Sequence, residues 1–258
     1  MTQMGITPKF RRIILSGYFF LTGICFSSWA SRIPDIKTHL GLSDGAFGAF
    51  LFFLPIVSFL GIPISGSLTA KYGSKTMVTL AAIFYPLALI NISFANNTSY
   101  LAFSLFIFGV IGNMFNVSVN TQATALAKLF DKSIISTFHG FWSLAGFVGG
   151  LLGGLFVAKS ISTFQQFITV AIIGWIFLLI TKNYLMPDEK STTSIKKMWT
   201  KPSPLLFQFG LVAFSNMICE GMMFDWSGVY YKDVIHASDT WRTTGYICFM
   251  ACMTTGRM

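Results

Sequence analysis

Charged side chains are scarce in this sequence, and their scarcity limits the kind of protein that it can encode. Only 10% of the 258 residues are Asp, Glu, Lys or Arg, whereas 53% are hydrophobic. Soluble globular proteins carry about 25% charged residues. A water-soluble fold of this composition would leave too much apolar surface in contact with water, so we expect a protein that lies in a membrane.

Cysteine and histidine are also scarce, and those present do not form a reactive constellation. The sequence has four cysteines, all inside apolar runs, and three histidines, without metal-ligand spacing. Ser143 lies four residues after His139 on one predicted helix, and no nucleophile and base pair is evident. We therefore expect no disulfide framework, no metal, no cofactor and no enzymatic activity.

Long hydrophobic runs recur along the whole chain. A helix needs roughly 20 apolar residues to cross a hydrocarbon core of about 30 Å. The sequence predicts seven complete spans, at residues 13–30, 45–68, 76–94, 100–122, 134–157, 164–181 and 205–230. An eighth apolar run begins near Thr243 and continues to Met258. It offers about 16 residues, too few to span comfortably, so we expect a truncation there.

The basic residues favour one orientation in the membrane. The net charge is +9, and most lysines and arginines fall in the segments that lie inside if the amino terminus is cytoplasmic. Examples are Lys9, Arg11 and Arg12 before the first span. Loops on the cytoplasmic side are enriched in basic residues. We therefore expect a multi-pass protein of the bacterial inner (plasma) membrane with its amino terminus inside, and no nucleic-acid partner.

The spacing of the spans divides the chain into three parts. Residues 1–185 hold six spans, residues 186–204 form a longer basic linker rich in proline, serine and threonine, and residues 205–258 begin a second set. This layout is typical of a six-plus-six transporter. The predicted fold is an all-α, polytopic membrane helical bundle whose second half is incomplete.

The loop after the second span resembles the signature of the major facilitator superfamily. It places Gly66, Lys71, Gly73 and Lys75 at matching positions. Gly66 permits close helix approach, Gly73 permits a tight turn, and the lysines keep the loop inside. The resemblance implies that this loop is an inner gate. Ala70 stands where the family usually has an aspartate, which weakens the case for a charge-paired gate.

Four further stretches, residues 29–34, 116–123, 138–143 and 220–227, resemble the fucose-permease-like branch of that superfamily. The branch contains proton-coupled sugar symporters and uncharacterised permeases. The resemblance implies a secondary transporter that takes up a sugar-like solute with protons by alternating access. A carrier that exports drugs or metabolites, and a membrane receptor or scaffold that transports nothing, remain alternatives.

A few ionisable groups lie inside apolar spans, where a charge costs about 3 kcal/mol. Glu220 shares one arc of its predicted helix with Asn216 and Ser227. We expect Glu220 to exchange the coupled proton; alternatively, it only links two helices. Asp225 and His139 are further candidates for proton coupling. Asp225 can instead be an interfacial anchor, and His139 a satisfied hydrogen-bonding residue.

Uncharged polar and aromatic side chains are the candidates for solute binding. Asn113, Asn116 and Asn120 share one arc of the fourth span, and amides suit hydroxylated neutral solutes. Interhelical hydrogen bonding is the alternative. Tryptophans from opposite bundles can stack on a sugar-like ring, or can anchor the protein at the membrane interface. The predicted solute contacts are Trp29, Asn113, Asn116, Asn120, Trp142, Asn216 and Trp226.

The remaining expectations concern packing, the outer surface and partners. Gly146, Gly150 and Gly153 share a face of the fifth span, which indicates close helix packing. The charges at the outer ends of the first and seventh spans are expected to be solvated: Arg32, Asp35, Lys232 and Asp233. The expected partners are a small solute, protons and the lipid bilayer, and the expected oligomeric state is a monomer.

Overall fold

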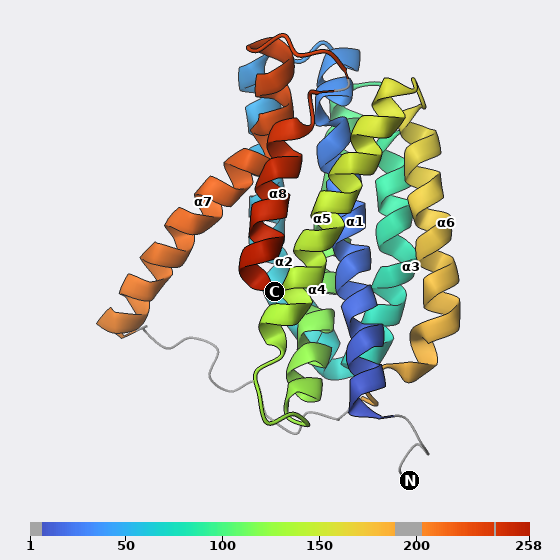
Figure 1. Ribbon diagram of the computed structural model, residues 1–258, viewed down its shortest axis with the longest axis vertical. Helices are drawn as coiled ribbons and strands as arrows, with labels where there is room; N and C mark the ends of the chain where they lie inside the picture. Colours follow the sequence, from blue (N-terminus) through green and yellow to red (C-terminus); the bar gives the residue numbers. More distant parts are fainter. Residues whose placement is uncertain (1–6, 189–202, 240) are drawn as a thin grey trace.

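The computed structural model describes residues 7–188, 203–239 and 241–258, and within these residues the regular structure is entirely helical (Figure 1). The helices are α1 (Pro8–His39), α2 (Asp44–Tyr72), α3 (Ser74–Ile92), α4 (Thr98–Ala127), α5 (Ile135–Ala158), α6 (Thr163–Thr181), η1 (Lys182–Tyr184), α7 (Pro204–Asp233) and α8 (Thr244–Arg257). Every predicted span coincides with a helix, and the all-α prediction is confirmed.

Most helices begin at a residue that caps them. The side chains of Ser43, Asn97, Ser162 and Ser203 each accept a hydrogen bond from the backbone N–H three residues later. Such caps satisfy N–H groups that have no partner inside the helix. Gly73, at φ +90°, ends α2 and begins α3 with a conformation that side chains disfavour. Short polar caps thus separate the long apolar runs.

The first six helices form one bundle around α1. Helix α1 packs against α5, α6 and α4, and α3 packs against α4 and α6. Seven of the described helices are long and apolar enough to cross a membrane. Many large apolar side chains on the outside of the bundle are exposed, for example Phe103, Ile173 and Leu179. This exposure suits a surface that contacts lipid chains.

The glycine-lined face of α5 lies between two helices. A methyl group added at Gly149 or Gly153 would collide with serines of α1, and one added at Gly146 or Gly150 would collide with side chains of α8. Helix α5 therefore approaches α1 and α8 more closely than larger residues would allow. The sequence predicts this packing face.

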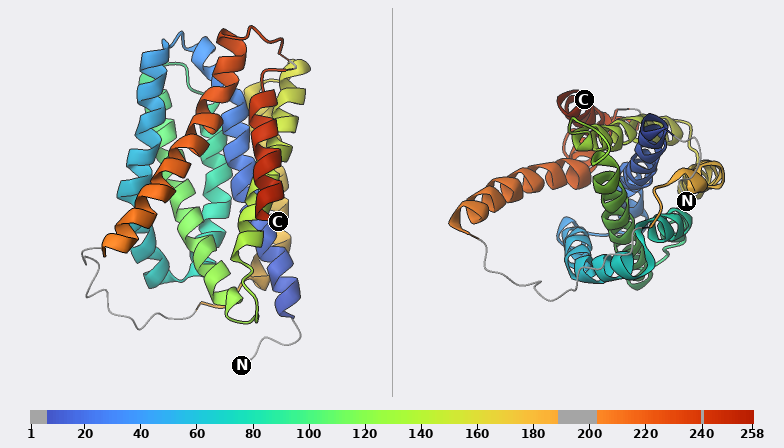
Figure 2. Two further views of the ribbon diagram at one scale, coloured as in Figure 1. Left: turned by 60° about the vertical axis from the view of Figure 1, so that its left-hand side comes forward. Right: turned by 90° about the horizontal axis from the view of Figure 1, so that it is seen from below.

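Helix α7 contacts the rest of the protein mainly at one end. Every residue from 204 to 219 is exposed, whereas the other end of α7 packs against α1 and α8. In Figure 2, the first half of α7 leans away from the six-helix bundle. Of the predicted linker, residues 189–202 lie outside the described residues, and residues 186–188 pack against the bundle.

Candidate functional site

A cavity of about 520 Å³ lies among α1, α2, α3, α4 and α5. Three of the predicted solute contacts line it: Asn113, Asn116 and Trp142. Phe26 and Tyr85 contribute aromatic surface to the same wall. None of the described residues that line the cavity carries a charge. The cavity therefore combines aromatic surface with neutral hydrogen-bonding groups.

The amides of this cavity are held by hydrogen bonds. The Asn113 amide nitrogen donates to the backbone oxygen of Ser58 on α2. Asn120 donates from its amide nitrogen to Asn116 Oδ1 at 2.6 Å and to the Asn116 backbone oxygen at 2.9 Å. Among the described residues, Asn113 Oδ1 and the Asn116 amide nitrogen have no hydrogen-bond partner, so the wall offers a solute one acceptor and one donor group. Asn120 positions Asn116 rather than lining the cavity itself.

Aromatic rings connect the cavity wall to α7 and α8. The ring of Phe224 lies 5.6 Å from that of Phe26 and 5.8 Å from that of Trp142. It also lies 5.6 Å from the ring of Phe249 on α8. A single side chain of α7 therefore joins the cavity wall to the later helices through edge contacts that stabilise aromatic clusters.

Glu220 is ion-paired. Arg257 of α8 donates to Glu220 Oε1 at 2.9 Å and, through its other terminal nitrogen, to Ser143 Oγ of α5 at 2.9 Å. Asn216 donates to the same Glu220 oxygen at 3.0 Å, and Ser143 Oγ donates to the His139 backbone oxygen at 3.1 Å. This group, here called the Glu220 cluster, joins α5, α7 and α8 and neutralises the carboxylate with a guanidinium.

The other predicted residues of α1 and α7 lie apart from the cavity. Trp29 is fully buried, and its indole N–H has no partner among the described residues. Trp226 packs edge-on against Phe47, with ring centroids 6.0 Å apart. Asp225 is half-buried, and no cation of the described residues lies within ion-pair distance of it. Their roles remain predictions.

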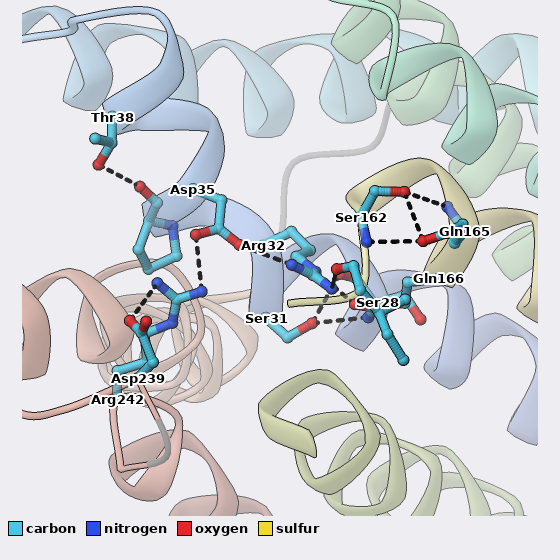
Figure 3. Close-up of polar contacts among 12 residues, drawn as sticks. Ser28, Ser31, Arg32, Asp35, Thr38, Ser162, Gln165, Gln166, Asp239 and Arg242 are labelled. Atoms are coloured by element: carbon cyan, nitrogen blue, oxygen red, sulfur yellow. Dashed lines mark hydrogen bonds and ion pairs between the residues drawn. The ribbon is translucent and has the colours of Figure 1, made fainter. Parts of the chain in front are cut away.

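The end of the bundle that the sequence predicts to face outside holds a buried charge network (Figure 3). Asp35 accepts from Arg32 at 3.0 Å and from Arg242 at 2.7 Å, and the two arginines are only 4% and 3% exposed. Arg32 also donates to Gln166 Oε1 at 2.6 Å and to the Ile161 backbone oxygen at 2.7 Å. The expectation that Arg32 is solvated is wrong, because these acceptors satisfy its guanidinium inside the protein.

A second ion pair lies beside this network. Lys37 of α1 contacts Asp233 at the end of α7 at 2.5 Å, and also contacts Asp44 at 2.6 Å. Lys232 donates to Thr38 Oγ1 of α1. The pairs Asp35–Arg242 and Lys37–Asp233, here called the outer lock, join α1 to the segment that contains α7 and α8. Lys232 and Asp233 thus bridge helices instead of facing solvent alone.

The sequence contained one signal for the outer lock that the interpretation missed. Charges of both signs stand at the outer ends of the first and seventh spans and before the eighth. Opposite charges at the same membrane depth can pair across helices. Only the folded arrangement says which groups meet, since Asp35 and Arg242 are 207 residues apart.

The predicted gating loop lies at the opposite end of the bundle from the outer lock. A methyl group on Gly66 would meet open space, so this glycine makes no close helix contact within the described part of the chain. Lys71 is exposed, with its ammonium 5.1 Å from the Tyr72 ring. Gly73 provides the predicted turn. Close helix approach at Gly66 and the role of this loop as a gate therefore stay predictions.

A carboxylate from a distant part of the chain contacts the predicted gating loop. Asp188, after α6, accepts from the backbone N–H of Lys75 at 2.6 Å, in the first turn of α3. Gln122 of α4 is 1% exposed and donates to Ser74 Oγ at 2.8 Å. Position 70 lacks the acidic residue of the family signature. Asp188 supplies a negative charge at the start of α3, where it interacts favourably with the partial positive charge of the helix amino terminus.

Comparison with known proteins identifies the family. Residues 14–258 match the Major Facilitator Superfamily. The chain belongs to this superfamily. It is 27% identical over 245 residues to the uncharacterised transporter y4wD of Sinorhizobium fredii, covering 93% of this chain and 64% of that protein. It is 29% identical over 242 residues to an uncharacterised MFS-type transporter of Yersinia pestis, covering 93% and 62%.

The fold is also similar to that of a solved transporter. The crystal structure of the POT family transporter PepTSo matches with a TM-score of 0.52 at 10% identity, covering 98% of this chain and 54% of that one. The superfamily and the seven membrane-length helices together make this a multi-pass membrane protein. The chain spans less than two thirds of the length of these relatives.

Proposed function

We propose that this protein is a secondary carrier that takes up a small, uncharged, sugar-like solute together with protons. The cavity that contains Asn113, Asn116 and Trp142 supports this most directly. Its volume of about 520 Å³ falls within the usual range of ligand sites, roughly 300–1,000 Å³. A ring with hydroxyl groups can stack on the aromatic wall and exchange hydrogen bonds with the amides, whereas an ion would find no opposite charge in the lining.

The arrangement of α7 supports transport by alternating access. The outer lock holds α7 and the start of α8 against α1, while the first half of α7 lies away from the bundle. In our proposal this is a state closed toward the outside, with the amino terminus in the cytoplasm and the chain in an inner (plasma) membrane. Residues 1–185 and the helices from residue 205 onward would rock about the solute site, joined by the linker at residues 186–204.

The Glu220 cluster suits a role in proton coupling. When a proton neutralises Glu220, Arg257 loses its counter-ion, and its bond to Ser143 of α5 becomes its main remaining side-chain contact. Protonation would thereby change how α7 and α8 are held to the bundle. His139 lies at the edge of this cluster, and Asp225, without a described cation, is the second carboxyl group that could take a proton.

The motif resemblance supports the solute class. The four stretches that resemble the fucose-permease-like branch follow the same order along the chain, and three of them contain Asn116, Trp142 and Glu220, one residue in each. We propose membership of that branch on this basis. Uptake of a neutral sugar or polyol is therefore the first activity to test.

The test is solute-driven proton uptake in vesicles that carry the full-length protein. We expect external alkalinisation with at least one neutral sugar or polyol, and its loss in Glu220→Gln and in Arg257→Gln. Asp131 is an exposed carboxylate outside the cluster, so the control variant Asp131→Asn should behave like the parent protein. If no neutral sugar or polyol gives a signal, export or a receptor role replaces this proposal; if Glu220→Gln retains the signal, the coupling group lies elsewhere.

A further inference from the structure

A second cavity, of about 660 Å³, lies at the amino-terminal end of α1, between α1 and the start of α5. Three cations line it, Lys9, Arg12 and Lys132, against one carboxylate, Asp131. Among the described residues, no carboxylate lies within ion-pair distance of any of these three cations. Arg12 donates to Thr137 Oγ1 of α5 at 3.1 Å, which fixes its guanidinium at the cavity. This cavity therefore holds excess positive charge.

An apolar cavity of about 370 Å³ lies over α1 between α5 and α6. Phe20 and Val148 are among its mainly hydrophobic lining residues. Ile173 lines it as well and is 63% exposed, and Leu152 is 39% exposed, so the cavity opens on the outer surface of the bundle. Because α5 and α6 are membrane-length helices, this opening faces lipid chains.

The two cavities adjoin, and together they are here called the groove. Phe141 of α5 lines both. Along α1, Arg12 and Ser16 line the basic cavity, and Phe20 and Ile24 line the apolar one. This spacing of four residues keeps all four side chains on one face of the helix. From Arg12 to Ile24 the groove is about 18 Å long, at 1.5 Å per residue, which is close to the depth of one leaflet of a hydrocarbon core of about 30 Å.

We propose that this groove binds one phospholipid with an anionic headgroup. The phosphate lies among Lys9, Arg12 and Lys132, and one acyl chain runs past Phe141 and Phe20 between α5 and α6. Basic pockets between membrane helices on the cytoplasmic side suit anionic headgroups, and the proposed orientation places Lys9 on that side. A soluble phosphate would use only the basic end, whereas a lipid fills both ends. The binding does not depend on whether the protein transports a sugar.

The charge of the site is tested by titrating the purified full-length protein with phosphatidylglycerol or phosphatidylcholine and counting bound lipids by native mass spectrometry. We expect tighter binding of phosphatidylglycerol. The triple variant with Lys9→Gln, Arg12→Gln and Lys132→Gln should lose about fivefold in affinity for each removed cation, or ~1 kcal/mol each. A matched triple variant removes equal charge elsewhere on the same side of the protein: Lys71→Gln, Lys75→Gln and Lys128→Gln. It should bind like the parent protein.

The apolar arm is tested by filling the groove without changing its charge. Ile173→Trp should weaken phosphatidylglycerol binding about fourfold for each methylene that it keeps out, or ~0.8 kcal/mol. Ile172→Trp changes the neighbouring residue, which is also exposed but does not line the groove, and should have no effect. Equal binding of both lipids, or equal losses in the two tryptophan variants, would overturn the proposal. So would a loss confined to the charge variant, because that pattern indicates a soluble-phosphate site.

Discussion

The carboxylate of Asp35 contacts two buried guanidinium groups, and replacing it with an amide tests whether the outer lock holds α1 to the later helices. In Asp35→Asn, Arg242 loses its only described ion-pair partner on α1 and keeps Asp239. Arg32 keeps Gln166 and the Ile161 backbone oxygen, both of which belong to the six-helix bundle. The variant therefore removes a contact across the two sets of helices while the bundle itself remains bonded.

The expected magnitude follows from the burial of the pair. Removing one partner of a fully buried ion pair costs about 3–5 kcal/mol. The Asp35 side chain is 28% exposed, so water screens part of this interaction. We expect that Asp35→Asn favours the outward-open state by about 2 kcal/mol, which is roughly a 30-fold increase in its population relative to the closed state.

Labelling of the cavity from outside measures that population. Asn116 lines the cavity and is exposed within the described structure. In a background without the four native cysteines, Asn116→Cys should react with a membrane-impermeant maleimide only when the outer end opens. Adding Asp35→Asn should raise the labelling rate about 30-fold, as long as the open fraction remains small.

Two further variants distinguish opening of the outer lock from a general destabilisation of the protein. Asp239→Asn makes the same chemical change beside the same Arg242, but its ion pair lies within one segment and Asp239 is 71% exposed. We expect less than about a fivefold change, since exposed pairs contribute at most about 1 kcal/mol. Lys37→Gln breaks the other pair of the lock and should open it. Parent-like labelling in Asp35→Asn, or equal acceleration by Asp239→Asn, would refute the reasoning.

Two other predictions concern the packing and the inner loop. Gly149→Val should lower the stability of the protein by about 1–3 kcal/mol, seen as a lower thermal midpoint in detergent, because the new side chain would collide with α1; Gly210→Val, in open space on α7, should not. Asp188→Ala removes the acceptor of the Lys75 N–H, and losing such a cap destabilises the start of a helix by about 1 kcal/mol. The start of α3 should then unfold locally more often, so trypsin added on the cytoplasmic side should cleave at Lys75 about fivefold faster. Asp131→Ala should leave cleavage unchanged, and cleavage only from the outside would contradict the orientation.

The spans could be predicted from the sequence because hydrocarbon thickness dictates the length of each apolar run. The run predicted at residues 164–181 becomes α6 at Thr163–Thr181, and the run at 76–94 becomes α3 at Ser74–Ile92. The arc of asparagines could also be recognised, since helical periodicity alone puts Asn113 and Asn116 near one another. Their meeting with Trp142 at one cavity required the packing of α4 against the rest of the bundle.

The polar contacts between distant segments could not be predicted, because helix periodicity relates only residues that are close in sequence. Arg257 reaches Glu220 across 37 residues, and Asp188 reaches the start of α3 across 113. A sequence shows that a charge lies near a membrane interface, but solvation and pairing produce the same local pattern. Arg32 illustrates the ambiguity: its neighbours in sequence are compatible with solvent exposure, and only contacts with α6 and its preceding loop bury it.

The cavity and the charged groups come from different sets of helices. The cavity wall belongs to α1 through α5, whereas Glu220 and Arg257 belong to α7 and α8. Among the described residues, the contacts that connect the sets near the cavity include the bond from Arg257 to Ser143 and the packing of Phe224 on Phe26 and Trp142. Ser143 and Trp142 are adjacent on α5. In our proposal, a change in the charge of Glu220 therefore reaches the cavity wall through neighbouring residues of α5, and this route lets a proton and a neutral solute influence each other.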